Sequence, residues 1–272
     1  MINKDALRIS SALLSKAKDL GADLAGFAAV EDLKKAPSFT FAPQMAGAGE
    51  GIGTRKNDLG LQPGEVAWPE NAKTVMVVAV NHSEDKPEMD WWYGRQDPPG
   101  NRILAKTVRE LCAWISEQFG AAVFHLPYHV EKGGTYLKDA AVLAGLGCIG
   151  KNNNLVTPEY GPRVRLRALT LDVALPPTGP SGFDPCAMCN ELCRKACPQK
   201  AFAEKLYSAA DYSQDILPGR EGVFARPVCN KQMTLDNDVA EEKTIDGFQD
   251  PVKIIKYCRR CELACPVGKI TD

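Results

Sequence analysis

Cysteine is the residue type in this chain whose spacing most directly indicates chemistry. Eight of the ten cysteines lie in the last third of the sequence, and two runs of them end in Cys-Pro. The first run holds Cys186, Cys189, Cys193 and Cys197, the second holds Cys258, Cys261 and Cys265, and Cys229 stands between them. A cubane iron-sulfur cluster needs four thiolates that converge from several sides. The count and spacing therefore predict two 4Fe-4S clusters.

The two runs also predict which cysteines share a cluster. In two-cluster ferredoxins the fourth cysteine of each run binds the other cluster. This rule assigns one cluster to Cys186, Cys189, Cys193 and Cys265. It assigns the second cluster to Cys197, Cys229, Cys258 and Cys261. The spacing departs from the bacterial pattern at one place, because three residues rather than two separate Cys189 from Cys193.

Zinc and disulfide bonds are the alternative explanations for these cysteines. Pairs of the Cys-x2-Cys type also bind zinc, but a zinc site needs neither the Cys-Pro endings nor the further close cysteines. Disulfides are disfavoured because the start of the chain lacks the apolar core of a secretory signal. Outside the runs, Cys112 lies on the apolar face of an expected helix and is interpreted as a core residue.

The composition is that of an ordinary globular protein. The 272 residues are 44% hydrophobic and 25% charged, with a formal net charge of -1. This balance provides no basic surface for nucleic acid, and the apolar stretches are too short to span a bilayer. These features predict a cytoplasmic protein that binds neither nucleic acid nor membrane. A reducing compartment also suits oxygen-sensitive clusters.

Apolar periodicity predicts alternating helices and strands before the cysteines. Helices are expected at residues 3–20, 102–119 and 135–144, and strands at residues 24–30, 74–80, 121–126 and 164–175. A stretch rich in Gly and Pro, residues 36–72, is expected to be a long ordered loop. This order predicts an α+β fold, with a sandwich core at residues 1–178 and a ferredoxin-like cluster domain at residues 179–272.

A glycine-rich loop follows the third expected helix. It contains Gly145, Gly147 and Gly150, and then Lys151, Asn152 and Asn153. Glycine lets the backbone approach a ligand closely, and lysine and amide side chains can bind phosphate or carboxamide groups. The loop is therefore a candidate cofactor site. A helix C-cap explains the first glycines without any ligand.

Three blocks of sequence, together with the double cysteine array, resemble the superfamily of epoxyqueuosine reductases and reductive dehalogenases. The blocks are Ala144-Gly-Leu-Gly-Cys-Ile-Gly-Lys-Asn152, Thr157-Pro-Glu-Tyr-Gly161 and Leu169-Thr-Leu-Asp-Val-Ala-Leu175. Their order and spacing match the superfamily from about Leu20 to the C-terminus. The resemblance implies a nitroreductase-like core that holds base-off cobalamin, with two 4Fe-4S clusters in a ferredoxin module beside it.

The same resemblance implies roles for residues near the glycine-rich loop. Residues 145–154, including Cys148, would lie against the corrin and its nucleotide tail, with Tyr160 and Gly161 nearby. An ungapped alignment puts Glu131 where epoxyqueuosine reductases carry an aspartate, so Glu131 would be the proton donor. Tyr136 is the alternative donor, because reductive dehalogenases use a tyrosine acid. Both residues could instead be solvated surface residues.

Two functions are consistent with these expectations. The first is a cobalamin-dependent reductase, in which ferredoxin or flavodoxin reduces one cluster and a corrinoid reduces a small organic substrate. The second is an electron-transfer protein that reduces or reactivates a partner corrinoid protein. Because the chain ends shortly after Cys265, we expect no helical-repeat domain of the kind that helps epoxyqueuosine reductases bind tRNA, and no tRNA substrate.

Overall fold

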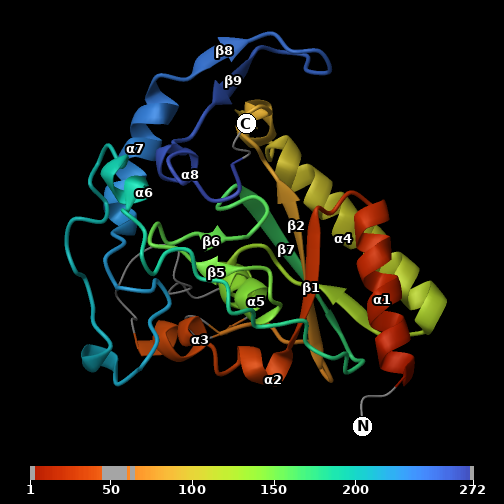
Figure 1. The fold of residues 1–272 in the computed structure, drawn as a ribbon. Helices are drawn as coiled ribbons and strands as arrows, with labels where there is room; N and C mark the ends of the chain where they lie inside the picture. The colour runs from red at the N-terminus through yellow and green to blue at the C-terminus, as the bar shows by residue number, and fades with distance from the viewer. Residues whose placement is uncertain (1–3, 45–59, 62–64, 270–272) are drawn as a thin grey trace.

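A four-stranded antiparallel sheet forms the centre of the computed structural model, which describes residues 4–44, 60–61 and 65–269 (Figure 1). Its strands lie in the order β1 (Leu24–Ala29), β2 (Thr74–Asn81), β7 (Val164–Leu171) and β4 (Val123–His125). Every residue of β2 except Asn81 is buried. Burial on both faces explains why this strand reads as an unbroken apolar run rather than an alternating one.

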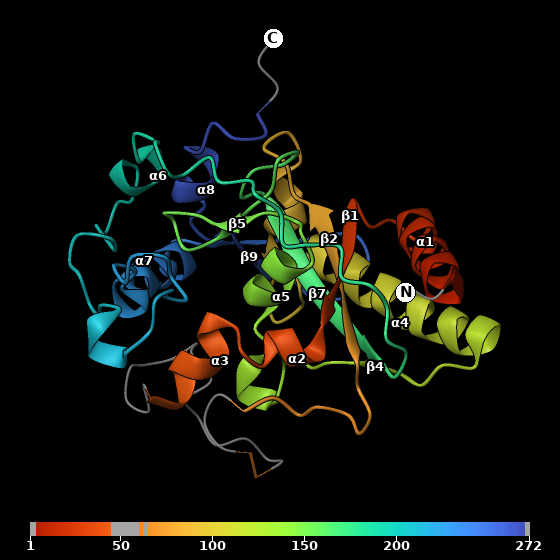
Figure 2. The same ribbon diagram turned by 60° about the horizontal axis from the view of Figure 1, so that its bottom comes forward.

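Helices cover both faces of this sheet (Figure 2). One face carries α1 (Lys4–Asp19) and α4 (Pro99–Phe119), and the other carries α2 (Val30–Leu33) and α5 (Leu137–Leu143). Two apolar clusters fill the two sides. Leu13 and Leu111 belong to the cluster under α1 and α4, whereas Val77 and Ala141 belong to the cluster under α5.

Short elements surround the side of the sheet that carries α5. They are α3 (Pro37–Phe41), η1 (Ala42–Gln44), η3 (Val130–Lys132), β5 (Cys148–Ile149) and β6 (Leu155–Val156), whereas η2 (Pro87–Asp90) packs against α4. Strands β5 and β6 pair as a small hairpin directly after α5. This hairpin contains the glycine-rich loop.

The cysteine-rich segment lies beside the α5 face. Its elements are α6 (Leu192–Lys195), η4 (Ala210–Tyr212), α7 (Arg226–Asp238), β8 (Glu241–Lys243), β9 (Val252–Ile255) and α8 (Arg260–Leu263). Strand β9 pairs with β8 and also with β3 (Trp92–Tyr93), which comes from the first part of the chain. Backbone hydrogen bonds therefore join the two parts, and the predicted boundary at residue 178 stays a prediction.

The predicted mixed α+β organisation is confirmed, with two local corrections. Strand β7 ends at Leu171 rather than at residue 175, because the next residues exchange ladder bonds for side-chain bonds. Thr74 Oγ1 donates to the Val173 carbonyl oxygen at 2.8 Å and accepts from the Leu175 N–H at 3.0 Å. Residues 37–44 are helical rather than looped, whereas residues 45–59 and 62–64 of the expected loop lie outside the described residues.

Among the described residues, no helix combines the length and the apolar character needed to cross a lipid bilayer.

Candidate functional site

Cys193 of the first run lies in α6, which packs against α8, and Cys186 and Cys189 precede this helix. Burial raises the pKa of Cys193 to about 11, and the nearby thiols of Cys265, Cys186 and Cys189 act in the same direction. Burial also raises the pKa of Cys265, with Cys186 and Cys189 again contributing. These four thiols are therefore neighbours, although they come from both cysteine runs.

The other four cysteines form a second group between α7 and α8. Burial raises the pKa of Cys229, and the thiols of Cys197 and Cys258 add to that shift. Burial likewise raises the pKa of Cys261, whose neighbours include Cys258 and Cys229. The second group thus also combines cysteines that are distant in the sequence.

The two groups adjoin and match the donor set of iron-sulfur clusters. Cys193 of the first group is among the thiols that act on Cys261 of the second. All ten cysteines are free thiols, which disfavours the disulfide alternative. The Ala201 N–H donates to Cys197 Sγ at 3.3 Å, a contact of the kind that tunes cluster potentials. The residues fit two clusters, and the assignment of ligands stays a prediction.

The space beside the glycines of the loop is taken by the chain's own backbone. A Cβ atom at Gly147 would lie 2.1 Å from the carbonyl oxygen of Val156. At Gly145, which has a φ of +74°, it would lie 2.7 Å from the carbonyl oxygen of Thr178. Gly150 is crowded by the Val156 side chain at 2.5 Å. Close packing against Val156 and Thr178 therefore explains these glycines, and their contact with a cofactor stays a prediction.

Lys151 joins the loop to the first cysteine run. Its Nζ atom lies 2.8 Å from Glu191 Oε1, and this hydrogen bond raises the pKa of Lys151. Arg194 Nε donates to the Lys151 carbonyl oxygen at 2.8 Å. Among the described residues Asn152 Nδ2 is buried and has no hydrogen-bond partner. Lys151 is therefore engaged with Glu191, whereas the buried amide N–H of Asn152 has no acceptor within the described residues.

Cys148 lies beside a predicted cluster ligand. A hydrogen bond between the two thiols lowers the pKa of Cys186 to about 6 and raises that of Cys148. Asp184 Oδ1 accepts from the Cys148 thiol at 3.9 Å and from the Cys186 N–H at 3.1 Å. The structure thus brings Cys148, predicted as a cofactor contact, to the first cysteine group.

Tyr160 and Gly161 contact the second cysteine run. A Cβ atom at Gly161 would lie 2.1 Å from the carbonyl oxygen of Val267. Gly268 packs equally closely, since its Cβ atom would lie 2.4 Å from the carbonyl carbon of Tyr160. These two predicted cofactor contacts therefore adjoin the segment that carries Cys265.

Tyr136, one of the two predicted proton donors, belongs to a small apolar cluster. Tyr136 is 8% exposed and packs edge-on against Phe39, with ring centroids 4.7 Å apart. Val130 contributes to the same cluster, together with Trp68. The interpretation of Tyr136 as a solvated surface residue is wrong. Glu131 belongs to η3, but its side chain lies outside the described part of the structure.

Two charged residues of α5 were missed by sequence reasoning. Burial lowers the pKa of Lys138 to about 8, and Lys138 Nζ donates to the Asn153 carbonyl oxygen at 2.6 Å. Burial raises the pKa of Asp139, which accepts from Ser38 Oγ at 2.5 Å. No pattern in the sequence distinguished these two charges from an ordinary solvated pair at the start of a helix. Both residues support the loop and its surroundings.

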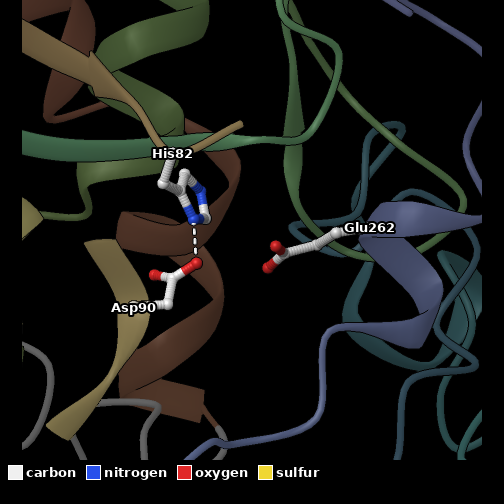
Figure 3. A group of neighbouring side chains, drawn as sticks. All are labelled: His82, Asp90 and Glu262. Atoms are coloured by element: carbon white, nitrogen blue, oxygen red, sulfur yellow. Dashed lines mark hydrogen bonds and ion pairs between the residues drawn. The ribbon is translucent and has the colours of Figure 1, made fainter. Parts of the chain in front are cut away.

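A second set of polar residues joins the sheet to α8. His82, Asp90 and Glu262 point toward one another in Figure 3, with potential metal-ligand atoms within 4.8 Å of each other. Arg165 Nε donates to Asp90 at 2.6 Å, and Arg259 forms ion pairs with Asp90 at 2.7 Å and with Glu262 at 2.9 Å. The two guanidinium groups already supply the positive charge, so a divalent cation would be repelled.

The same network controls the ionisation of its central carboxylate. Burial opposes ionisation of Asp90, but the hydrogen bond from His82 and the charges of Arg165 and Arg259 outweigh it and lower the pKa of Asp90. Asp90 is therefore a charged anchor between η2, β7 and the start of α8. We interpret this network as a structural connection.

A groove of about 490 Å³ adjoins the second cysteine group. Its lining includes Trp91, Lys256, Cys258 and Arg260. The Lys256 ammonium lies 4.3 Å from the centroid of the Trp91 ring, which is a cation–π contact. The groove therefore brings surface side chains next to a predicted cluster ligand.

Sequence comparison finds relatives of two kinds, although no protein-family model matches the chain. An epoxyqueuosine reductase of Lactococcus garvieae is 25% identical over 263 residues, covering 93% of this chain and 68% of the relative. A tetrachloroethene reductive dehalogenase of Desulfitobacterium hafniense is 38% identical over 68 residues, covering 24% of this chain and 12% of the relative.

The similar solved structures are also epoxyqueuosine reductases and reductive dehalogenases. An epoxyqueuosine reductase from Streptococcus thermophilus matches with a TM-score of 0.60 at 20% identity, over 97% of this chain and 67% of that one. An epoxyqueuosine reductase from Bacillus subtilis, with its aspartate catalytic loop swung out of the active site, also has a TM-score of 0.60. It is 18% identical, and the match covers 97% of this chain and 66% of that one. A reductive dehalogenase whose structure suggests a mechanism for B12-dependent dehalogenation scores 0.54 at 18% identity, over 95% and 32%.

The chain therefore has the fold shared by epoxyqueuosine reductases and reductive dehalogenases, and the resemblance predicted from the sequence is confirmed. It spans about two-thirds of the length of these epoxyqueuosine reductases and about one-third of that of the dehalogenase.

Proposed function

We propose that this protein is an iron-sulfur and cobalamin-dependent oxidoreductase that reduces a small organic substrate. The observation that carries the proposal is the pair of adjacent cysteine groups, each drawn from separate parts of the cysteine-rich segment and one of them beside the glycine-rich loop. Four thiolates in each group would hold a 4Fe-4S cluster. A base-off corrinoid at the loop would supply low-valent cobalt as the reductant.

The loop has a chemical basis for holding the corrinoid. The unpartnered Asn152 amide is a donor that the nucleotide tail could use, since a buried N–H without an acceptor is unfavourable. The structurally similar reductive dehalogenase, which is described as B12-dependent, supports cobalamin as the cofactor. The buried Tyr136 phenol and the Glu131 carboxyl are the proposed proton donors, and the aspartate catalytic loop of the Bacillus subtilis relative supports a carboxyl group in this role.

The arrangement of the thiol groups supports an order for electron transfer. The groove adjoins Cys258 of the second group, the second group adjoins the first at Cys261 and Cys193, and the first adjoins the loop at Cys186 and Cys148. We propose that a ferredoxin or flavodoxin docks near the groove and reduces the second cluster. Electrons then pass through the first cluster toward the loop.

An electron-transfer protein for a partner corrinoid protein is the second candidate. The groove favours it, because Cys258 lies at a surface that a larger partner could also approach. In that case this chain would hold clusters without a corrinoid of its own.

Anaerobic purification followed by metal analysis distinguishes these functions. We expect about eight irons and eight sulfides per chain, from two four-iron clusters, together with about one cobalt after reconstitution with cobalamin. Iron without cobalt would favour the electron-transfer protein. Zinc without iron after anaerobic expression would contradict both.

A further inference from the structure

The second cysteine run is attached to the core by one buried arginine. Arg163, which is 4% exposed, lies just before β7. Its guanidinium group donates to the carbonyl oxygens of Glu262 at 3.3 Å, Cys265 at 3.2 Å and Val267 at 2.6 Å. One side chain therefore satisfies three backbone acceptors, one in α8 and two in the segment that follows it.

Backbone packing reinforces this attachment. A Cβ atom at Gly161 would lie 2.1 Å from the Val267 carbonyl oxygen, and one at Gly268 would lie 2.3 Å from the Gly161 nitrogen. Both glycines have positive φ angles, +57° and +68°. The turn before Arg163 and the segment after Cys265 thus meet without intervening side chains, an approach that only glycine permits.

This contact holds the backbone at Cys265, since the Arg163 guanidinium bonds its carbonyl oxygen at 3.2 Å. In the crossed assignment, Cys265 binds the same cluster as Cys186, Cys189 and Cys193, although it follows Cys258 and Cys261 in the sequence. The helix before it, α8, has only 4 residues and cannot hold the following segment rigidly by itself. The core, through Arg163, supplies the missing constraint.

We propose that Arg163 is a positioning residue that holds Cys265 in place as the fourth ligand of the first cluster. This inference rests on the proposed function, because it requires that clusters be bound. A planar guanidinium can direct several N–H groups at separate acceptors, whereas the single ammonium of lysine cannot reproduce that geometry.

The experiment compares Arg163→Met and Arg163→Lys with the control Lys269→Met in anaerobically prepared protein. Lys269 belongs to the same end of the chain, but its ion pair with Glu84 is exposed, with side-chain exposures of 39% and 60%. Three properties are measured: iron per chain, the electron paramagnetic resonance signals of the reduced clusters, and hydrogen exchange of the backbone at residues 262–268.

We expect Arg163→Met to lower the iron content from about eight to about four per chain and to remove one cluster signal. Exchange at residues 262–268 should rise in the same variant. Arg163→Lys should have an intermediate iron content. If Arg163→Met does not fold, the same three measurements on Arg163→Lys test the proposal. Lys269→Met should match the wild type, because exposed ion pairs contribute little.

Two results would overturn the inference. One is wild-type iron content and wild-type exchange in both Arg163 variants, and the other is selective loss of the cluster held by Cys258 and Cys261. Failure of the proposed function is seen elsewhere, as an absence of iron from the wild-type protein itself. The two failures are therefore distinguishable.

Discussion

Lys151 Nζ lies 2.8 Å from Glu191 Oε1, which joins the glycine-rich loop to the residues between Cys189 and Cys193. The loop and the first cysteine run are thus held together by a direct ion pair between side chains 13% and 39% exposed. Because ion pairs of this exposure contribute modestly to stability, their effect on the neighbouring site can be measured without unfolding the protein.

Variants of this pair test whether Lys151 contacts the cofactor. We expect Lys151→Met to weaken cobalamin binding about tenfold, the effect of losing roughly 1.4 kcal/mol, and Glu191→Gln to leave it unchanged. Binding is measured by titration followed by absorption spectroscopy. Equal effects of the two substitutions would show instead that Lys151 serves only to hold the loop.

The crossed ligand assignment is tested by Cys265→Ala. We expect loss of the cluster held by Cys186, Cys189 and Cys193, so that iron falls from about eight to about four per chain. The cluster of Cys258 and Cys261 should keep its paramagnetic resonance signal. Loss of that second signal would refute the assignment.

Gly147→Val tests the packing of the hairpin. The new side chain would collide with the carbonyl oxygen of Val156, which lies 2.1 Å from the Cβ position. We expect a loss of about 1–3 kcal/mol in the free energy of unfolding, measured by anaerobic denaturation. Gly182→Val is the control, because a Cβ atom there meets nothing within 4 Å. A variant at Gly147 with unchanged stability and lost cobalamin binding would restore the role of this glycine at the cofactor.

The proton donor is tested by Glu131→Gln and Tyr136→Phe. Removal of the acid should lower turnover by roughly 100-fold, while reduction of the clusters stays normal. We expect this loss in Glu131→Gln, with Tyr136→Phe as the comparison. A loss confined to Tyr136→Phe would transfer the role to the phenol, and full turnover in both variants would exclude both.

The buried amine of Lys138 should make stability depend on pH. Burial lowers its pKa to about 8 from the ordinary value of 10.5, so the unfolded chain binds more protons between these values. The free energy of unfolding should therefore rise with pH across this window, by at most about 1.4 kcal/mol per pH unit.

Anaerobic denaturation at several pH values measures this effect. Lys138→Met should remove the rise, whereas Lys106→Met, whose side chain is 66% exposed, should preserve it. If the free energy of unfolding still rises with pH in Lys138→Met, another titrating group causes the pH dependence.

Local patterns in the sequence were enough to predict the main elements and the kind of fold. The apolar stripe of α4 and Gly120 after it define that helix, because amphipathic periodicity and a left-handed C-cap are local properties. The cysteine spacing was likewise sufficient to predict two sets of metal ligands, since adjacent ligands on a chain can reach the same cluster.

Only the tertiary structure shows which residues pack against the glycine-rich loop and which groups Arg163 binds. The glycines of the loop suggested space for a ligand, but Val156 and Thr178 fill that space from elsewhere in the chain. Arg163 gave no sequence signal, because its three acceptors are backbone carbonyl oxygens, which every residue possesses. Long-range packing places backbone groups and charges beside particular side chains, and that placement is not encoded in any local pattern.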